Sequence, residues 1–310
     1  MTGRIVVLTG GVGGAKLALG MCAAAPAGSV TAIVNTGDDF SHFGLFVSPD
    51  IDTLLYTLSG QANAEQGWGR ENETASFMTA LRSLGAEDWF NLGDGDLALH
   101  VLRTHLRGLG VSLSEITKRF ARAWRLEAEI LPMTDDPVST QLQTDDGVLA
   151  FQHYFVKRRC APRVRDVRYC GSGEARPAPG LLEALRDADA IIIAPSNPYL
   201  SIGPILAIPE IREALLTASA PRVAVSPIIG GESVKGPTSK LMRELGVAVD
   251  NQSIADFYGG LIDGLVIDER DAAPAGDVSV RKTNILMWTT DDKRRVAEAA
   301  LAFADELRAP

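Results

Sequence analysis

The chain has 310 residues, of which 46% are hydrophobic and 22% charged, and its net charge is −9. This length allows one large domain or two smaller ones, and the acidic balance argues against a general nucleic-acid binder, which usually carries a basic stripe. The longest apolar runs are far too short to span a bilayer, and the three cysteines form no Cys-x-x-Cys pair. We therefore expect a cytoplasmic protein with reduced thiols.

The first fifty residues begin as a strand, a glycine loop and a helix. The run "RIVVLTGG" predicts a strand, "GAKLALGMCAAA" a helix, and "VTAIVNTGDD" a second strand that ends in two carboxylates. Short, wholly apolar strands of this kind indicate a buried parallel sheet.

Helical patterns dominate from about residue 53 to residue 130. They lie in "ETASFMTALRSLG", "DLALHVLRTHLRGLG" and "SLSEITKRFARAW", and Ser112 or Ser114 is the expected N-cap of the third helix. Two β-type runs in "VSTQLQTDDGVLAFQHYFVKR" then flank Asp145-Asp146-Gly147, which predicts a hairpin, and "APRVRDVRYC" predicts a further strand.

The α/β alternation resumes near residue 181 and continues to a C-terminal helix in "DKRRVAEAALAFADEL". Strands are expected in "ADAIIIAP" and "APRVAVSP", and a helix followed by a strand in "PTSKLMRELGVAV". The expected fold class is α/β, a Rossmann-like parallel sheet with helices on both faces, formed by residues 1–52 and 181–310. Residues 53–180 are expected to form a mostly helical insertion with a β-hairpin, packed over the active-site edge.

The glycine loop, residues 10–14, fits neither common nucleotide fingerprint. A dinucleotide motif starting at Gly11 needs glycine where the chain has Lys16, and a P-loop needs Gly-Lys-Ser/Thr where the chain reads Ala15-Lys16-Leu17. Glycine still lets the backbone approach a ligand, and a helix N-terminus offers free N–H groups. The loop predicts a phosphate or anion site, with a plain tight turn as the alternative.

Four acids follow the second predicted strand and are expected on loops, where a sheet edge binds ligands: Asp38, Asp39, Asp50 and Asp52. Grouped carboxylates suit Mg²⁺ better than a ribose contact, although loop carboxylates are often solvated caps. Asp94 or Asp96 is expected to cap the helix that follows it, and Asp135 and Asp136 to lie in a turn.

Two later loops have polar side chains suited to ligand contact. The loop "APSNPYLSIGPILAIP" carries Ser196, Asn197 and Ser201, which suit a base edge or a phosphate, or else a structural proline turn. The loop "SPIIGGESVKGPTSKLM" carries Lys235 and Lys240 beside glycine turns, which suit a phosphate or simply solvent. The histidines have no metal-site spacing, and no Ser/His/Asp pattern is present.

Eight segments together resemble one family. They are "GGVGGAKL", "NTGDD", "SPDIDTLLYTL", "GDGDLALH", "MTDDPVST", "APSNPYLSIGPILA", "SPIIGGESVKGPTSKLM" and "ADFYGGLIDGLVID". From Leu8 to about Asp268 the chain is similar to the 2-phospho-L-lactate transferases (CofD, called FbiA in actinobacteria) of coenzyme F420 biosynthesis. The resemblance implies transfer of a small phosphorylated acid from its guanosine diphosphate ester to the deazaflavin FO. It also implies release of GMP, a Mg²⁺ cofactor and a homodimer.

The resemblance also implies roles for residues. It places Asp52 and Asn91 at the FO site, and we expect Asp39 and Asp52 to act in catalysis or hold the metal, with Asp38 and Asp50 as lesser candidates. Facing the phosphates we expect Gly11, Gly13, Gly14 and Lys16. Near the guanosine we expect Ser196, Asn197 and Ser201.

Three questions stay open at this point. The donated acid is phospholactate, phosphoenolpyruvate or phosphoglycerate. A Rossmann dehydrogenase is disfavoured because the third fingerprint glycine is missing. A non-enzymatic nucleotide-binding regulator of the YvcK type is the remaining alternative.

Overall fold

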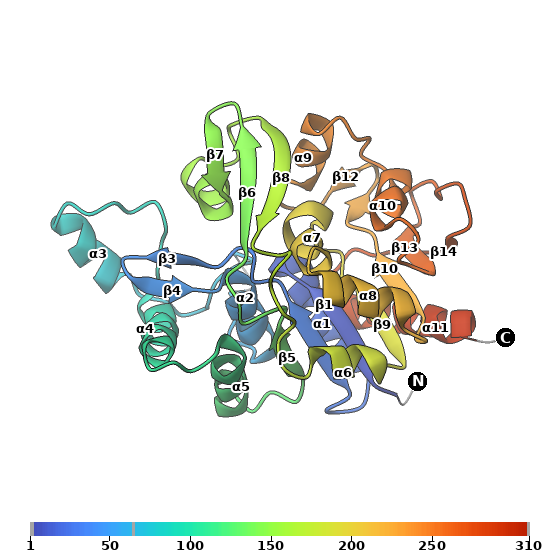
Figure 1. Cartoon of the computed structure of the whole chain (residues 1–310), viewed down its shortest axis with the longest axis horizontal. Coiled ribbons are helices and arrows are strands. Elements are labelled where there is room, and N and C mark those ends of the chain that lie inside the picture. Colours follow the sequence, from blue (N-terminus) through green and yellow to red (C-terminus); the bar gives the residue numbers. More distant parts are fainter. Residues whose placement is uncertain (1–2, 64–65, 309–310) are drawn as a thin grey trace.

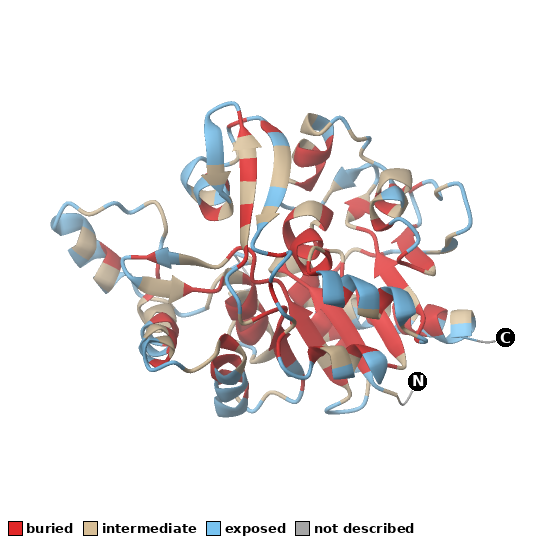
Figure 2. Ribbon diagram, in the orientation of Figure 1, coloured by how far each residue is buried: buried red, intermediate tan, exposed pale blue. Residues whose placement is uncertain are grey.

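The computed structural model describes residues 3–63 and 66–308. Its centre is a seven-stranded sheet in the order β14-β13-β10-β9-β1-β2-β5, in which every neighbouring pair is parallel (Figure 1). In chain order its strands are β1 (Ile5–Thr9), β2 (Val30–Val34), β5 (Glu129–Pro132), β9 (Ala190–Ile193), β10 (Arg222–Val225), β13 (Gly264–Asp268) and β14 (Ser279–Thr283). The central strands are buried on both faces, as their unbroken apolar runs predict, and they stand out in Figure 2.

Helices cover both faces of this sheet, which confirms the expected α/β class. On one face α1 (Gly11–Ala24), α2 (Pro49–Leu58), α5 (Leu113–Ala123) and α11 (Thr290–Arg308) pack on alternate strand residues such as Ile5 and Val7. On the other face α6 (Leu181–Arg186), α8 (Pro209–Thr217) and α10 (Asn251–Tyr258) pack on Val6 and Leu8. No described helix is long and apolar enough to cross a membrane.

A second, antiparallel sheet lies at the top of Figure 1, away from the N-terminus. It contains β6 (Ser139–Thr144), β7 (Gly147–Ala150) and β8 (Val164–Cys170), in the order β7-β6-β8. The hairpin predicted around Asp145-Asp146-Gly147 joins β6 to β7 and is confirmed. Its second run is shorter than expected, because the chain becomes helical again in η1 (His153–Lys157).

The helical part of the chain contains α3 (Ser76–Ser83), α4 (Asp94–Gly108) and α5, beside a small hairpin of β3 (Phe40–His42) and β4 (Leu45–Val47). Ser112 caps α5 in a full capping box with Glu115, which confirms one of the two predicted caps. Asp94 does not cap its own helix. It accepts hydrogen bonds from the backbone N–H groups of Ser76 and Phe77 and therefore caps α3.

Three features differ from the sequence expectations. Strand β5 lies inside the predicted insertion 53–180, yet it pairs with β2 in the central sheet. Asp50 and Asp52 lie in the first turn of α2 rather than on loops, because Pro49 starts a helix there. The strand expected at 246–249 is absent, since α9 (Thr238–Glu244) is followed by a turn.

The shorter elements complete the edge where the central strands end. They are η2 (Pro198–Ile202), α7 (Gly203–Leu206), β11 (Ile228–Ile229) and β12 (Glu232–Ser233). Segments η2 and α7 follow β9, and the pair β11–β12 follows β10, so both polar loops singled out in the sequence leave carboxyl ends of central strands.

Candidate active site

A cavity of about 670 Å³ lies at the carboxyl ends of the central strands. Its lining includes Gly10 after β1, Asp38 after β2, Ser196 after β9 and Ser226 after β10. In open α/β sheets this edge is where ligands bind. The opposite wall comes from residues 53–180 and is largely aromatic: Trp68, Trp89, Phe90, Phe151 and Phe155. The cavity therefore has one side built by the central sheet and one side built by the inserted segments.

The glycine turn forms the floor of the cavity. Gly11 adopts a φ of +63°, and a Cβ on Gly13 would lie only 2.9 Å from the carbonyl oxygen of Pro195. Gly11, Gly13 and Lys16 line the cavity. Gly14 does not, because it packs against Thr9 and the hydroxyl of Ser196, where a side chain would clash. Three of the four residues expected to face phosphate are thus brought together.

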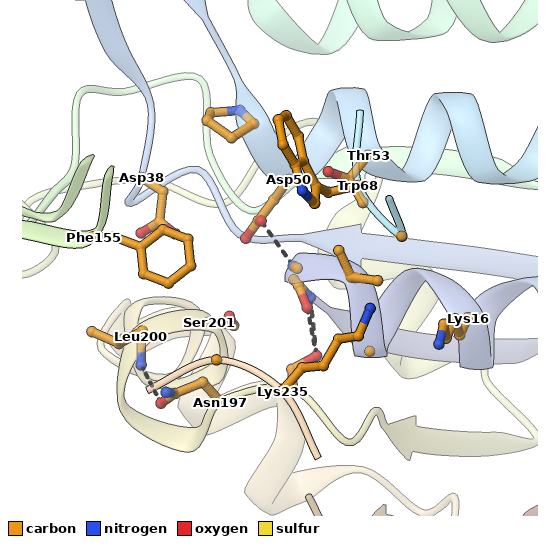
Figure 3. Close-up of a pocket in the computed structure, with 18 of the residues that line it drawn as sticks. Lys16, Asp38, Asp50, Thr53, Trp68, Phe155, Asn197, Leu200, Ser201 and Lys235 are labelled. Atoms are coloured by element: carbon orange, nitrogen blue, oxygen red, sulfur yellow. Dashed lines mark hydrogen bonds between the residues drawn. The ribbon is translucent and has the colours of Figure 1, made fainter. Parts of the chain in front are cut away.

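Two lysines lie beside the first turn of α1. Lys16 Nζ donates to the carbonyl oxygen of Met287 at 3.0 Å and lies 5.2 Å from the centre of the Trp288 ring. Burial lowers the pKa of Lys16, and the positive charges of Lys235 and Lys293 lower it further. Among the described residues neither Lys16 nor Lys235 forms an ion pair with an acid, and both line the cavity (Figure 3). This side of the cavity suits an anion.

Asp50 connects the acidic cluster to the glycine turn. Its Oδ1 accepts the backbone N–H of Gly11 at 2.8 Å, and its Oδ2 accepts the side-chain amide of Asn35 at 2.9 Å. Burial raises its pKa to about 6 in spite of these hydrogen bonds. Burial, and then the charge of Asp50, raise the pKa of Asp38 well above its ordinary value. Both carboxylates point into the cavity in Figure 3.

Asp39 lies behind this wall rather than in the cavity lining. Its Oδ2 accepts the hydroxyl of Ser48 at 2.7 Å, while its Oδ1 is buried without a hydrogen-bond partner among the described residues. Burial raises its pKa, although the Ser48 hydrogen bond and the charge of Arg103 oppose that shift.

Asp52 lines the cavity and is paired with Arg103, which the sequence analysis did not single out. Both terminal nitrogens of this fully buried arginine donate to the Asp52 carboxylate, one of them at 3.1 Å. Arg103 also contacts His100, and His100 contacts Asp96. A signal was present, because positions 96, 100 and 103 repeat at i, i+4 and i+7 on one helix face.

The serine–asparagine loop mainly holds the glycine turn. Ser196 Oγ donates to the carbonyl oxygen of Gly10 at 2.7 Å and accepts its N–H at 3.3 Å. Asn197 Oδ1 caps η2, which leaves its Nδ2 without a partner among the described residues, and Ser201 is buried against Gly10. All three loop residues line the cavity, as does the exposed Asn91 on the far wall.

Asp135 and Asp136, in the other acidic loop, have structural roles. Asp135 accepts hydrogen bonds from the backbone and hydroxyl of Ser114, and Asp136 accepts one from the backbone of Arg176. Neither lines the cavity. Within the described part of the chain no three or more His, Cys, Asp or Glu side chains are grouped as a ready metal site.

Comparison with known proteins identifies the family. The family model described as 2-phospho-L-lactate transferase CofD matches residues 5–305. The chain is 43% identical to the phosphoenolpyruvate transferase of Streptomyces griseus, covering 99% of this chain and 100% of that protein. It is 38% identical to the 2-phospho-L-lactate transferase of Methanosarcina mazei, covering 95% and 98%.

A solved structure supports the fold. Protein BH3568 of Bacillus halodurans matches with a TM-score of 0.65 over 97% of this chain and 100% of that one, at 18% identity. A likeness at this identity is one of fold alone. The family model and the two relatives go further, and together they show that the chain is a transferase that belongs to the 2-phospho-L-lactate transferase CofD family.

Proposed function

We propose that the protein transfers phosphoenolpyruvate from its guanosine diphosphate ester to a ribityl hydroxyl of FO. Several relatives at 41–43% identity are named phosphoenolpyruvate transferases, which favours this acid over phospholactate or phosphoglycerate. The observation that carries the proposal is that one cavity is lined both by two lysines near the glycine turn, here called the cationic side, and by aromatic side chains of the inserted segments, here called the aromatic side. Such a cavity suits a nucleotide and a flat ring system held face to face.

The nucleotide belongs on the cationic side. A diphosphate would relieve the repulsion between Lys16 and Lys235 and would lie near the N-terminus of α1, where helix N–H groups favour negative charge. Asn197 also lines the cavity, and its buried Nδ2, which has no hydrogen-bond partner among the described residues, suits an oxygen of the guanosine.

The deazaflavin belongs on the aromatic side. Trp89, Phe90 and Phe155 offer ring faces and edges to a flat ring system. Asp52 and Asn91 also line the cavity and offer hydrogen-bond acceptors to ribityl hydroxyls. The Arg103 pair holds Asp52 in place for that contact.

The chemistry requires no covalent intermediate with the protein. The FO hydroxyl attacks the phosphorus that carries the enolpyruvyl group, the bond to the bridging oxygen breaks, and GMP leaves with that oxygen. The hydroxyl proton goes to a carboxylate, and we assign this role to Asp50. The pKa of Asp50 is raised to about 6, which is near neutral pH. Asp50 also contacts the glycine turn and is two residues before Asp52 on α2. The sequence expectation had favoured Asp39 or Asp52.

The residues present fit Mg²⁺. Asp38 Oδ1, Asp39 Oδ1 and Thr36 Oγ1 are buried oxygens without hydrogen-bond partners among the described residues, and oxygen is the donor that Mg²⁺ prefers. Asp38, which lines the cavity, would hold the ion, with Asp39 behind it, whereas both oxygens of Asp52 are engaged by Arg103. A bound Mg²⁺ would neutralise charge on the diphosphate.

Ligand titration tests the proposal. FO fluorescence should change on addition of the protein, and GDP should bind the same protein in a Mg²⁺-dependent manner. A regulator of the YvcK type would bind a nucleotide and leave FO fluorescence unchanged, and that outcome would contradict the proposal. The homodimer and the cytoplasmic location stay predictions.

A further inference from the structure

A buried polar network connects α4 to α2 beside the cavity. Arg103 is 0% exposed and His100 1% exposed, and both lie on α4. On α2 both contact Asp52, and one helical turn further along α2 Tyr56 donates to Asp96 of α4. Burying a guanidinium is costly unless its charge is paired, so an arginine at this position needs the Asp52 carboxylate.

We propose that Arg103, held by His100, is a positioning residue that fixes the Asp52 carboxylate for the acceptor substrate. This inference rests on the proposed function and assigns a specific effect within it. The Arg103–His100 pair sets the affinity for a polyhydroxylated acceptor such as FO and leaves the nucleotide side unchanged.

The first step is the geometry of the ion pair. Arg103 Nη1 donates to Asp52 Oδ2 at 3.1 Å, and Nη2 donates to Oδ1. Two parallel bonds from a rigid fork fix the plane of a carboxylate as well as its place. The lone pairs that remain on Asp52 are available to ligand hydroxyls, since Asp52 lines the cavity.

The second step is the orientation of Arg103 itself. Its Nη1 lies 3.3 Å from His100 Nδ1, and an arginine can only donate, so Nδ1 is the acceptor and the ring proton is on Nε2. That nitrogen lies 3.1 Å from Asp96 Oδ2, and Asp96 Oδ1 accepts the hydroxyl of Tyr56 at 2.5 Å. The imidazole therefore accepts from the arginine on one side and lies beside a second carboxylate on the other, where its Nε2 makes no hydrogen bond among the described residues.

The position of the polar network at the cavity distinguishes ligand contact from helix packing. Apolar side chains of similar volume would join α2 to α4 as well as an ion pair does, and often better. Yet four members of the network face the cavity: Asp52, Tyr56, Asp96 and His100. A polar network that places its buried charge at a ligand wall is explained by ligand contact rather than by packing.

The test measures FO and GDP affinity of the full chain by fluorescence titration and calorimetry, at fixed Mg²⁺. Arg103→Lys keeps the charge and loses the fork, and it should weaken FO binding at least tenfold while GDP binding changes less than twofold. The matched control is Arg107→Met, one turn further along α4, which stacks on Phe46 outside the cavity lining. Both affinities should stay unchanged in that variant.

Variants of His100 give a second test that does not alter a buried charge. His100→Gln can still accept from Arg103 through its side-chain oxygen, so FO affinity should stay near that of the wild type. His100→Phe cannot accept from Arg103 and should match Arg103→Lys. Asp52→Asn and Arg103→Met should also be non-additive for FO affinity, because they break the same interaction.

Two results would overturn the inference. One is normal FO affinity in Arg103→Lys and His100→Phe. The other is a parallel loss of FO and GDP affinity, which would assign the network to the fold alone. If the wild type does not bind FO at all, the proposed function fails and this inference fails with it, so the wild-type titration distinguishes the two failures.

Discussion

The backbone N–H of Gly11 donates to Oδ1 of Asp50 at 2.8 Å, so the N-terminus of α1 already has a carboxylate in place. A phosphate cannot accept from that N–H while Asp50 does. The nucleotide phosphates are therefore expected further along the first turn, toward Lys16 and Lys235. Asp50 therefore lies in the cavity lining directly beside the glycine turn.

The first prediction concerns stability against pH. The pKa of Asp50 is about 6 in the folded protein and 3.8 ordinarily, so its protonated form stabilises the fold below about pH 4, and this is lost as pH rises through 6. Asp50→Asn keeps a neutral side chain at every pH. Its free energy of unfolding relative to wild type should rise between pH 4 and pH 7, by at most about 3 kcal/mol. The free energies of unfolding are measured by urea denaturation. A difference between variant and wild type that stays constant from pH 4 to pH 7 would contradict the assigned pKa.

The second prediction separates the roles of two neighbouring acids. Asp50→Asn removes the proton acceptor and should lower kcat by roughly a hundredfold or more with little change in the KM for FO. Asp52→Asn removes an acceptor contact and should instead raise the KM for FO. Steady-state kinetics with both variants measures this, and the reverse pattern would exchange the two roles.

The third prediction concerns Gly14. Its hydrogen faces Thr9 and Ser196, so Gly14→Ala forces a methyl group into a filled space and should destabilise the fold by about 1–3 kcal/mol. Gly108 is the matched control, because it also lies in a helix and has open space where the methyl group of an alanine would lie. Gly108→Ala should be neutral or stabilising by up to about 1 kcal/mol. Equal melting temperatures for the two variants would refute the close approach at Gly14.

The fourth prediction concerns the two cavity lysines. Lys235→Ala or Lys16→Ala should weaken GDP binding about tenfold, because each removes a charge-assisted contact to phosphate worth ~1.4 kcal/mol. FO affinity should be unchanged. Lys118 on α5 lies outside the cavity lining, and Lys118→Ala serves as the control. Equal GDP affinities in the Lys16→Ala, Lys235→Ala and Lys118→Ala variants would contradict a phosphate site beside the two cavity lysines.

The sequence predicted four of the seven strands of the central sheet, β1, β2, β9 and β10, because each is a local apolar run, and it did not predict β5, β13 or β14. The runs at 5–8 and 190–193 are apolar on both faces and can only be buried. Strand β5 was missed because its four residues, "EILP", look like a helix-to-turn connector until β2 pairs with them.

The site was harder to predict because its contacts join distant parts of the chain. Arg103 and Asp52 are 51 residues apart, and a lone arginine on an amphipathic helix is normally solvated. Asp50 and Gly11 are 39 residues apart, and no local pattern shows that one caps the other. The glycine turn itself was predictable, since strand, glycines and helix follow one another directly.

A coupled turnover assay tests the proposed transfer to FO most directly. Purified protein is mixed with FO, GTP, Mg²⁺ and a suitable guanylyltransferase, with phosphoenolpyruvate, 2-phospholactate or 3-phosphoglycerate supplied in turn, and products are read by mass. We expect a phosphodiester of FO and an equal amount of GMP, formed fastest with phosphoenolpyruvate. No FO phosphodiester with any of the three acids, from protein that binds GDP, would contradict the proposed transfer.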